Sequence, residues 1–338
     1  DIIMVLRVAI NGFGRIGRLT FRIAMNHPNL DIVAINDLVE AKQLAHLLKY
    51  DSNYGTLNAE VQPGENYISV NGKKILTFME KDPIKLPWKD LNVDLVIEST
   101  GVFTDGQKAS AHLQAGAKKV IISAPAKNED ITIVMGVNEE KYDPSKHKII
   151  SNGSCTTNCI TPLVKVINDE FGIEKSYMNT VHSVTMDQRL QDAPHKDFRR
   201  MRAAGQSIIP TSTGASKSVE VVIPEMKGKF HALSMRVPTS TVSIVDFVAL
   251  VKKSTNKDEV NRTFEKWANG RMKGILQVVH EPLVSMDFKG NPHSSIVDSE
   301  LTDVVGENLI RVISWYDNEY GYACRLVDLM EYVYSKGI

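Results

Sequence analysis

The first half of the chain alternates short apolar runs with longer stretches in which apolar residues recur at helical spacing. The apolar runs have the length and the β-branched content of buried strands, whereas the stretches between them are typical of helices that cover a sheet. This alternation predicts a parallel sheet covered on both faces, which is a doubly wound α/β domain. The expected strands are residues 5–10, 31–35, 93–99, 120–123 and 131–137, and the expected helices are residues 15–26, 42–49 and 107–116.

The pattern changes after about residue 151. Strand candidates become longer and lose the regular helices between them, which favours a mixed or antiparallel sheet and hence an α+β second domain. A chain of 338 residues is long enough for two domains, each with its own core. The expected elements are a helix at 156–171, strands at 177–184, 229–237, 242–251 and 309–315, and a closing helix at 322–334.

Composition and charge exclude several classes of partner. Lys+Arg and Asp+Glu both number 40, so no excess of positive charge indicates a specific nucleic acid or an anionic membrane as partner. No apolar run approaches the roughly 20 residues that span a bilayer. The first ten residues are too short for a signal peptide and read as a first strand, with Met4 as a candidate natural start.

The chain contains three cysteines, Cys155, Cys159 and Cys324. Three are too few for a disulfide framework and fit a reducing compartment, so we expect a cytoplasmic protein with free thiols. Cys159 and Cys324 lie within expected helices, where an isolated cysteine is usually a small buried apolar residue. We expect no metal site.

A dinucleotide-binding signal follows the first strand. Gly12, Gly14 and Gly17 form a GxGxxG motif at the start of a helix, where they allow a tight turn, close approach of a pyrophosphate and close packing of helix and strand. Asp37 follows the second strand, twenty positions after Gly17. A carboxylate there accepts hydrogen bonds from the ribose hydroxyls of NAD and repels a 2′-phosphate, so the sequence predicts NAD as cofactor.

Cys155 is the candidate nucleophile. It lies in the polar segment SCTTNC at the start of a helix, where the helix dipole is expected to lower the thiol pKa below the roughly 8.5 of a free cysteine. His182 follows 27 residues later on a strand candidate. A helix followed by an adjacent strand returns the imidazole to the helix start, so the pair is expected to act as nucleophile and general base.

Along essentially its whole length the chain resembles phosphorylating glyceraldehyde-3-phosphate dehydrogenases. The matching segments are INGFGRIGR (10–18), AINDL (34–38), LLKYDS (47–52), ESTGVF (98–103), SCTTNC (154–159), PTSTGASK (210–217), MRVPT (235–239) and WYDNEYGY (315–322). The resemblance implies a Rossmann domain formed by 1–152 with a C-terminal helix at 320–338, a catalytic domain at 153–319 on a mostly antiparallel sheet, and a homotetramer.

The resemblance also implies roles for individual residues. Cys155 would be the nucleophile and His182 the base. The expected cofactor contacts are Gly12, Gly14, Arg15, Ile16, Gly17, Asp37, Thr100, Gly101, Ser123, Asn318 and Tyr322. The C3 phosphate of the substrate would contact Thr185 and Arg236. The attacking inorganic phosphate would contact Ser154, Thr156, Arg200, Thr213 and Gly214, with Arg199 and Arg202 as alternatives to Arg200.

These residues imply NAD-dependent oxidation of glyceraldehyde 3-phosphate, a phosphorylated aldehyde, to 1,3-bisphosphoglycerate through a thioester on Cys155. The alternatives are erythrose-4-phosphate dehydrogenase, a sister enzyme that releases an acid by hydrolysis, and a non-enzymatic redox-sensing or RNA-binding protein on the same scaffold. Thr185 and the segment 211–214 favour the phosphorylating enzyme over its sister. The joint presence of nucleophile, base, cofactor motif and anion sites argues against a pure binding protein.

Two departures from the family pattern lead to further expectations. Gly153 stands where members usually carry alanine, and we expect it to loosen the backbone before Cys155. Ala193 stands where members that accept NADP often carry alanine, whereas Pro194 and Asp37 are typical of NAD-specific members. We therefore expect a clear preference for NAD with secondary use of NADP.

Overall fold

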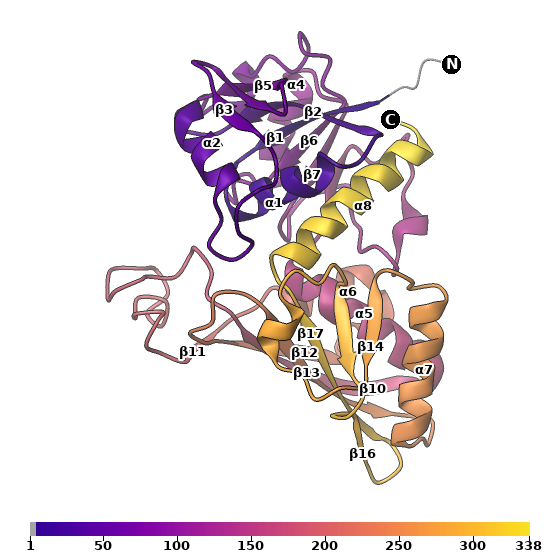
Figure 1. The fold of residues 1–338 in the computed structure, drawn as a ribbon. Coiled ribbons are helices and arrows are strands. Elements are labelled where there is room, and N and C mark those ends of the chain that lie inside the picture. Colours follow the sequence, from indigo (N-terminus) through magenta and orange to yellow (C-terminus); the bar gives the residue numbers. More distant parts are fainter. Residues whose placement is uncertain (1–4) are drawn as a thin grey trace. The chain divides into compact units, whose positions relative to one another are not determined.

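The computed structural model describes residues 5–338, so the expectation that Met4 is the natural start lies outside the described residues. The chain divides into two compact units (Figure 1). The first comprises the chain up to Ile133 together with 139–153 and 323–338, and the second comprises 134–138 and 154–322.

The first unit is built on one sheet with the strand order β3-β4-β5-β2-β1-β6-β7-β9-β8 over the described residues. Its strands are β1 (Leu6–Asn11), β2 (Leu30–Asn36), β3 (Val61–Pro63), β4 (Tyr67–Val70), β5 (Lys73–Phe78), β6 (Leu95–Glu98), β7 (Lys119–Ile122), β8 (Ile131–Thr132) and β9 (Ile149–Ser151). Its helices are α1 (Arg15–Ala24), α2 (Ala41–Lys49), α3 (Gly106–Ala109), α4 (Ala111–Gln114) and most of α8 (Tyr320–Lys336), with 3-10 turns η1 (Pro83–Lys85) and η2 (Glu139–Lys141).

The central strands are parallel and buried, which confirms the predicted doubly wound sheet. All four residues of β6 and of β7 are buried, as expected for strands with helices on both faces. The chain order reverses beside β1, which has β2 on one side and β6 on the other. In open α/β sheets such a switch point, at the carboxyl ends of the strands, is where ligands bind.

Three sequence expectations for this unit need correction. The hairpins β3-β4-β5 at the sheet edge are antiparallel and were not expected, because their exposed faces break the apolar runs. The helix expected at 107–116 consists of two short helices that meet at Ser110. The strand expected at 131–137 ends at Thr132, and Gly136 takes a positive φ of 85° that a strand does not allow.

The second unit has a mixed, mostly antiparallel sheet, which confirms the predicted α+β architecture. Among the described strands of the second unit, only β10 with β12 and β14 with β15 pair in parallel. The strands are β10 (Ile173–His182), β11 (Ile209–Thr211), β12 (Phe230–Arg236), β13 (Ser243–Val251), β14 (Leu276–Val279), β15 (Ser295–Asp298), β16 (Asp303–Val305) and β17 (Leu309–Tyr316). The helices are α5 (Cys155–Phe171), α6 (Ala215–Val222) and α7 (Lys257–Asn269), with 3-10 turns η3 (Pro224–Met226) and η4 (Ser285–Phe288).

The core of the second unit lies between helix α5 and the sheet. Cys159, Ile160 and Leu163 of α5 are buried in the same apolar cluster as Val245 and Phe247 of β13. Alternate residues of β13 are buried, the period-2 pattern of a strand with one face on a core. Cys159 is therefore a core residue, as expected.

Helix α8 contributes its last fourteen residues or so to the first unit. Within that unit Glu331 pairs with His27 at 3.2 Å, and Tyr332 stacks edge-on against Tyr142 with ring centroids 6.4 Å apart. Cys324 is buried in this helix. Within residues 5–338, no helix combines the length and apolar character needed to cross a bilayer.

Candidate active site

The glycine-rich turn of the first unit follows β1 and opens α1. Gly12 has a φ of 91°, and a Cβ on it would lie 2.6 Å from the backbone nitrogen of Thr100. A Cβ on Gly17 would lie 2.2 Å from the carbonyl oxygen of Gly12. Gly14, by contrast, has nothing within 4 Å of its Cβ position. The glycines therefore have the steric roles expected of this motif, and open space remains beside the N-terminus of α1 for a pyrophosphate.

Asp37 follows β2 and is tied to the same turn. Its Oδ2 accepts a hydrogen bond from the backbone N–H of Phe13 at 2.7 Å, and its Oδ1 accepts one from that of Leu38 at 2.6 Å. Each oxygen of an ionised carboxylate has a second lone pair. The side chain is thus held in place and remains able to accept hydrogen bonds from ribose hydroxyls.

Thr100, in the turn after β6, is anchored by the buried carboxylate of Glu98. Oε1 of Glu98 accepts from the backbone N–H of Thr100 at 3.0 Å and from its hydroxyl at 2.5 Å, while Oε2 accepts from Asn11 Nδ2 at 2.6 Å. Trp88 Nε1 donates to His112 Nδ1 at 3.0 Å, so His112 Nε2 carries the proton and donates to Glu98 at 2.8 Å. This buried network holds the Thr100 turn in place at the carboxyl ends of β1 and β6.

The other expected cofactor residues of this unit lie nearby in the sheet order. Gly101 has a positive φ of 73°, and Ser123 directly follows β7. Ile16 is half-buried in the first turn of α1. Arg15 forms a 2.5 Å ion pair with Asp51. Burial alone would raise the pKa of Asp51, but the Arg15 guanidinium and nearby backbone N–H groups hold it below its usual value. The pair orders the segment that follows α2.

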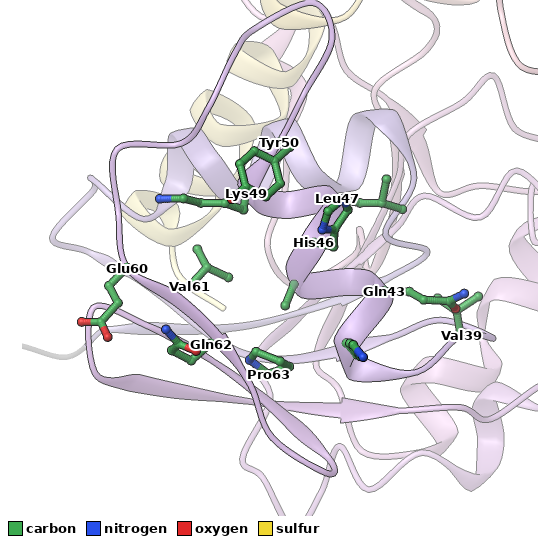
Figure 2. A pocket seen from close by; sticks show the side chains of 12 residues that line it. Val39, Gln43, His46, Leu47, Lys49, Tyr50, Glu60, Val61, Gln62 and Pro63 are labelled. Carbon is green, nitrogen blue, oxygen red and sulfur yellow. The ribbon is translucent and has the colours of Figure 1, made fainter.

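A hollow of about 850 Å³ lies between α2 and β3 (Figure 2). Figure 2 shows His46, Leu47 and Tyr50 of the α2 segment on one side and Val61 and Pro63 of β3 on the other. None of the site residues expected from the sequence lines it. The expected site residues lie instead at the strand ends of the first unit and, in the second unit, around the start of α5.

The structure brings Cys155 and His182 together at the start of α5. Ser154 caps this helix: its hydroxyl accepts from the backbone N–H of Thr157 at 3.0 Å, and the Thr157 hydroxyl accepts from the backbone N–H of Ser154 at 3.3 Å. Cys155 Sγ lies 3.4 Å from His182 Nε2. His182 Nδ1 donates to the carbonyl oxygen of Ser183 at 2.8 Å, so Nε2 presents a lone pair to the thiol.

The charge states of this pair differ from the sequence expectation. Burial raises the pKa of the Cys155 thiol, and the Arg236 guanidinium opposes this rise only in part. The expected lowering of the Cys155 pKa is therefore wrong, because desolvation of a thiolate outweighs its position at a helix end. Burial, together with Arg236, lowers the pKa of His182 to about 3. The pair rests as a neutral thiol facing a neutral imidazole.

Arg236 lies beside His182 because β10 and β12 pair in parallel with these two residues in register. Arg236 Nη1 donates to the hydroxyl of Thr185 at 2.6 Å. Its Nε is buried and has no hydrogen-bond partner among the described residues. Such a donor is costly unless something accepts from it. Thr185 and Arg236 thus form a cationic site next to Cys155 and His182, in which the N–H of Arg236 Nε is an unused donor.

Arg200 is the arginine of the segment HKDFRR that lies against β11. Its Nε donates to the hydroxyl of Thr211 at 2.8 Å, and its Nη2 donates to the carbonyl oxygen of Ser212 at 3.5 Å. Arg202 instead pairs with Asp192 at 3.0 Å on an exposed surface. The geometry favours Arg200 over Arg202 as the anion ligand.

The remaining expected phosphate contacts lie at the N-termini of α5 and α6, two helices that contact each other. Thr213 accepts from the backbone N–H of Ala215 at 3.2 Å, and Gly214 is the capping position of α6. On α5, Ser154 is the capping residue and Thr156 lies in the first turn. Helix N-termini with free N–H groups suit an anion.

Asn318 is oriented by two serines of the second unit. Its Oδ1 accepts from the hydroxyls of Ser183 at 2.9 Å and Ser243 at 3.0 Å, which presents the amide nitrogen as a donor. Tyr322, in the first turn of α8, is buried. Ser243 was missed by sequence reasoning, because only strand pairing brings it to this place.

Tyr316 is a second residue that sequence reasoning missed. Its hydroxyl lies 3.0 Å from that of Thr156 on α5 and 2.8 Å from that of Thr180 on β10, and its ring packs edge-on against His182. Tyr316 therefore joins the helix that carries Cys155 to the strand that carries His182. Its place in the segment WYDNEYGY was the only available signal.

Gly153 needs a correction. Its φ is +64°, a left-handed conformation that favours glycine. Glycine therefore relieves backbone strain immediately before Ser154 and Cys155, rather than loosening the chain there. The expectation of a loosely placed nucleophile is wrong, because the capping box also fixes the first turn of α5.

Comparisons with known proteins match both the segment with the glycine-rich turn and the segment with Cys155 and His182. The family model of the glyceraldehyde 3-phosphate dehydrogenase NAD binding domain matches residues 6–106, and that of the C-terminal domain of the same enzyme matches residues 154–318.

Among the described residues, no group of three or more His, Cys, Asp or Glu side chains could hold a metal ion.

Curated relatives match over nearly the whole chain. A glyceraldehyde-3-phosphate dehydrogenase of Geobacillus stearothermophilus is 56% identical over 99% of this chain and 100% of its own length. Glyceraldehyde-3-phosphate dehydrogenase 1 of Bacillus subtilis is also 56% identical over the same shares. A chloroplastic glyceraldehyde-3-phosphate dehydrogenase A of Chlamydomonas reinhardtii is 53% identical over 98% of this chain and 90% of its own.

Proposed function

The chain belongs to the glyceraldehyde-3-phosphate dehydrogenase family, and from this premise we propose that it oxidises glyceraldehyde 3-phosphate to 1,3-bisphosphoglycerate, with NAD and inorganic phosphate as co-substrates. The reaction serves glycolysis and gluconeogenesis. The observation that carries the proposal is the 3.4 Å contact between Cys155 Sγ and His182 Nε2, with the cationic site of Thr185 and Arg236 beside it.

The first unit is the proposed NAD-binding domain and the second the catalytic domain. The residues of the first unit fit the cofactor: the open space at Gly14 admits a pyrophosphate, and Asp37 accepts from ribose hydroxyls. In the second unit the amide nitrogen of Asn318 suits a carboxamide oxygen. When bound, NAD accepts a hydride from C1 of the substrate.

In the first step Cys155 Sγ forms a bond to the aldehyde carbon. The thiol proton passes through His182 Nε2 to the carbonyl oxygen, which gives a hemithioacetal on Cys155. His182 is suited to this relay because its ring is neutral and its Nδ1 is fixed by the Ser183 carbonyl. Arg236 and Thr185 hold the C3 phosphate and so keep the aldehyde carbon near Sγ.

In the second step His182 Nε2 accepts the hydroxyl proton of the hemithioacetal as hydride leaves C1. The product is a thioester between Cys155 and the acyl group. In the third step an oxygen of inorganic phosphate, held by Arg200 and the N-termini of α5 and α6, attacks the thioester carbon. The thiolate leaves and regains a proton from His182, and the acyl phosphate departs.

Erythrose-4-phosphate dehydrogenase is the rival activity. Arg200 and the N-terminus of α6 support the phosphorylating reaction over it, because hydrolysis needs no site for inorganic phosphate. Steady-state assays with both aldehydes, with and without inorganic phosphate, test the choice. We expect phosphate-dependent turnover of glyceraldehyde 3-phosphate, whereas phosphate-independent turnover of erythrose 4-phosphate would overturn the proposal.

We also propose a homotetramer in the cytoplasm, with NAD preferred and NADP used secondarily. The segment 183–208 supports the oligomer, because it exposes four large apolar side chains of the kind that interfaces bury. These are Met186, Leu190, Phe198 and Ile208, which are between 69% and 84% exposed. The three free cysteines support a reducing compartment.

A further inference from the structure

The carboxylate of Asp187 links the residues assigned to the two phosphate groups. Its Oδ1 accepts a hydrogen bond from the hydroxyl of Thr185, and its Oδ2 accepts one from Arg200 Nη1 at 2.5 Å. Thr185 belongs to the proposed site of the C3 phosphate, and Arg200 to that of inorganic phosphate. The side chain of Asp187 is 43% exposed, so solvent and ligands reach it.

Because of its hydrogen bonds, the Thr185 hydroxyl cannot donate to Asp187 and to a phosphate at the same time. A threonine hydroxyl has a single proton to donate. Here Thr185 Oγ1 accepts from Arg236 Nη1 at 2.6 Å and gives its own proton to Asp187. A phosphate oxygen can receive that proton only when Asp187 gives it up. Arg200 Nη1 directs one of its two N–H groups at Asp187 Oδ2, so Asp187 also occupies one of the donors that a phosphate would use.

Asp187 is also ionised under ordinary conditions. Burial alone would raise its pKa, but the Thr185 hydroxyl and the positive charges of Arg200 and Arg236 hold the pKa below its usual value. A carboxylate and a phosphate compete for the same donors because both are anionic oxygen acceptors. A fixed negative charge there also repels a bound phosphate.

We propose that Asp187 is an internal anion that competes with both phosphate groups for Thr185 and Arg200, and thereby weakens the affinity of the catalytic domain for phosphate. The inference rests on the proposed function, which assigns these donors to phosphate. Asp187 is a positioning residue, since it acts through its neighbours. Weak anion binding favours departure of a product that carries two phosphate groups.

The test is calorimetric titration of the full-length protein with inorganic phosphate alone. Asp187→Asn keeps the size of the side chain and removes its charge. We expect its Kd for phosphate to fall about three- to tenfold, the effect of one charge interaction at a half-exposed site. Asp187→Glu restores the charge and is expected to bind phosphate as the unmodified protein does. In steady-state assays the KM for phosphate falls in Asp187→Asn, whereas kcat does not rise.

Asp246→Asn is the matched control. Asp246 forms a two-point ion pair with Arg311 on β13 and β17, at 3.0 and 2.8 Å and with similar exposure, but away from the phosphate ligands. Its Kd for phosphate is expected to stay unchanged. An unchanged or higher Kd in both Asp187→Asn and Asp187→Ala would overturn the proposal and make Asp187 a residue that merely orients Arg200. Phosphate binding is measured without aldehyde. Inactivity towards glyceraldehyde 3-phosphate would therefore contradict the proposed function, whereas the Kd for phosphate would still test the role of Asp187.

Discussion

At the scale of single residues, the charge on Arg236 governs the chemistry of Cys155 and His182. His182 is buried and Cys155 is half-buried next to this guanidinium, which lowers the pKa of each. Lowering the pKa of the thiol favours the attacking thiolate, whereas lowering that of the imidazole keeps the base unprotonated. One cation therefore adjusts nucleophile and base in the directions that the reaction needs, although burial still leaves the thiol pKa above its ordinary value.

Replacing Arg236 with glutamine removes this charge, so we expect the pKa of Cys155 to rise further. The rate of alkylation by iodoacetamide, a neutral reagent that needs no phosphate site, follows the thiolate fraction. Its midpoint should move to higher pH in Arg236→Gln, because the charge that lowers the thiol pKa is gone. Arg311→Gln, on the same sheet, is the control and should leave the midpoint in place. A midpoint that stays or moves to lower pH contradicts this account of the site.

Gly153 gives a prediction about stability. Because its φ is +64°, alanine there is expected to lower the free energy of unfolding by about 1–2 kcal/mol. Gly205→Ala is the control, since Gly205 is not in the left-handed region and a Cβ there would have nothing within 4 Å. Urea unfolding of both variants checks the difference. Equal unfolding midpoints would show that the backbone at 153 is not constrained.

At the scale of elements, the parallel strands of the first unit deliver their polar residues to one edge. Asn11, Asn36 and Glu98 are paired in register at the ends of β1, β2 and β6. Asp37 and Thr100 follow immediately. The residues proposed to bind the cofactor thus lie together because parallel strands share a carboxyl edge. The sequence placed the glycine motif and Asp37 directly after strands, but it did not predict the buried network beneath them.

Glu98→Gln tests that network. Glu98 accepts from Thr100 on one oxygen and from Asn11 and His112 on the other. A glutamine at this position would turn its NH₂ group towards at least one of these donors. An unsatisfied buried donor is costly, so we expect the Thr100 turn to shift and the Kd for NAD to rise about tenfold. Glu65→Gln, at an exposed turn, is the control. Calorimetric titration with NAD measures both, and equal affinities would mean that the network is structural only.

We expect Asp37, which directly follows β2, to set the choice between NAD and NADP. Asp37→Asn removes the charge that repels a 2′-phosphate, so the ratio of kcat/KM for NAD to that for NADP is expected to fall at least about tenfold. Asp31→Asn, near the opposite end of the same strand, is the matched control and should leave the ratio unchanged. Steady-state kinetics with both cofactors provide the measurement. A ratio unaffected by Asp37→Asn would remove this residue from the cofactor site.

At the scale of the whole molecule, the sequence predicted both architectures and the Cys155–His182 pair. Periodicity was informative where strands are buried on both faces, as in β6 and β7, and failed at β3 and β5, which contain exposed residues, and at the four-residue strand β4 between them. The register of β10 with β12, which sets Arg236 beside His182, depends on pairing between distant segments. The roles of Tyr316, Ser243 and Asp187 could not be predicted for the same reason.

The exposed apolar residues of 183–208 predict assembly. Light scattering on the purified protein should give a mass four times the 37.6 kDa of one chain. Phe198, 80% exposed, is the residue to change: Phe198→Asp is expected to reduce the mass, whereas Val305→Asp, at an exposed apolar site elsewhere in the second unit, should not. A single-chain mass for the unmodified protein would contradict the proposed tetramer.

The proposed thioester on Cys155 can be detected by mixing the enzyme with glyceraldehyde 3-phosphate and NAD in the absence of phosphate, followed by mass spectrometry of the intact chain. We predict a burst of reduced cofactor of one equivalent per site and an acyl adduct on Cys155, which inorganic phosphate then discharges. Cys155→Ala should give neither burst nor adduct. Reduction of NAD by Cys155→Ala at an undiminished rate, or a burst without any adduct on Cys155, would contradict the proposed mechanism.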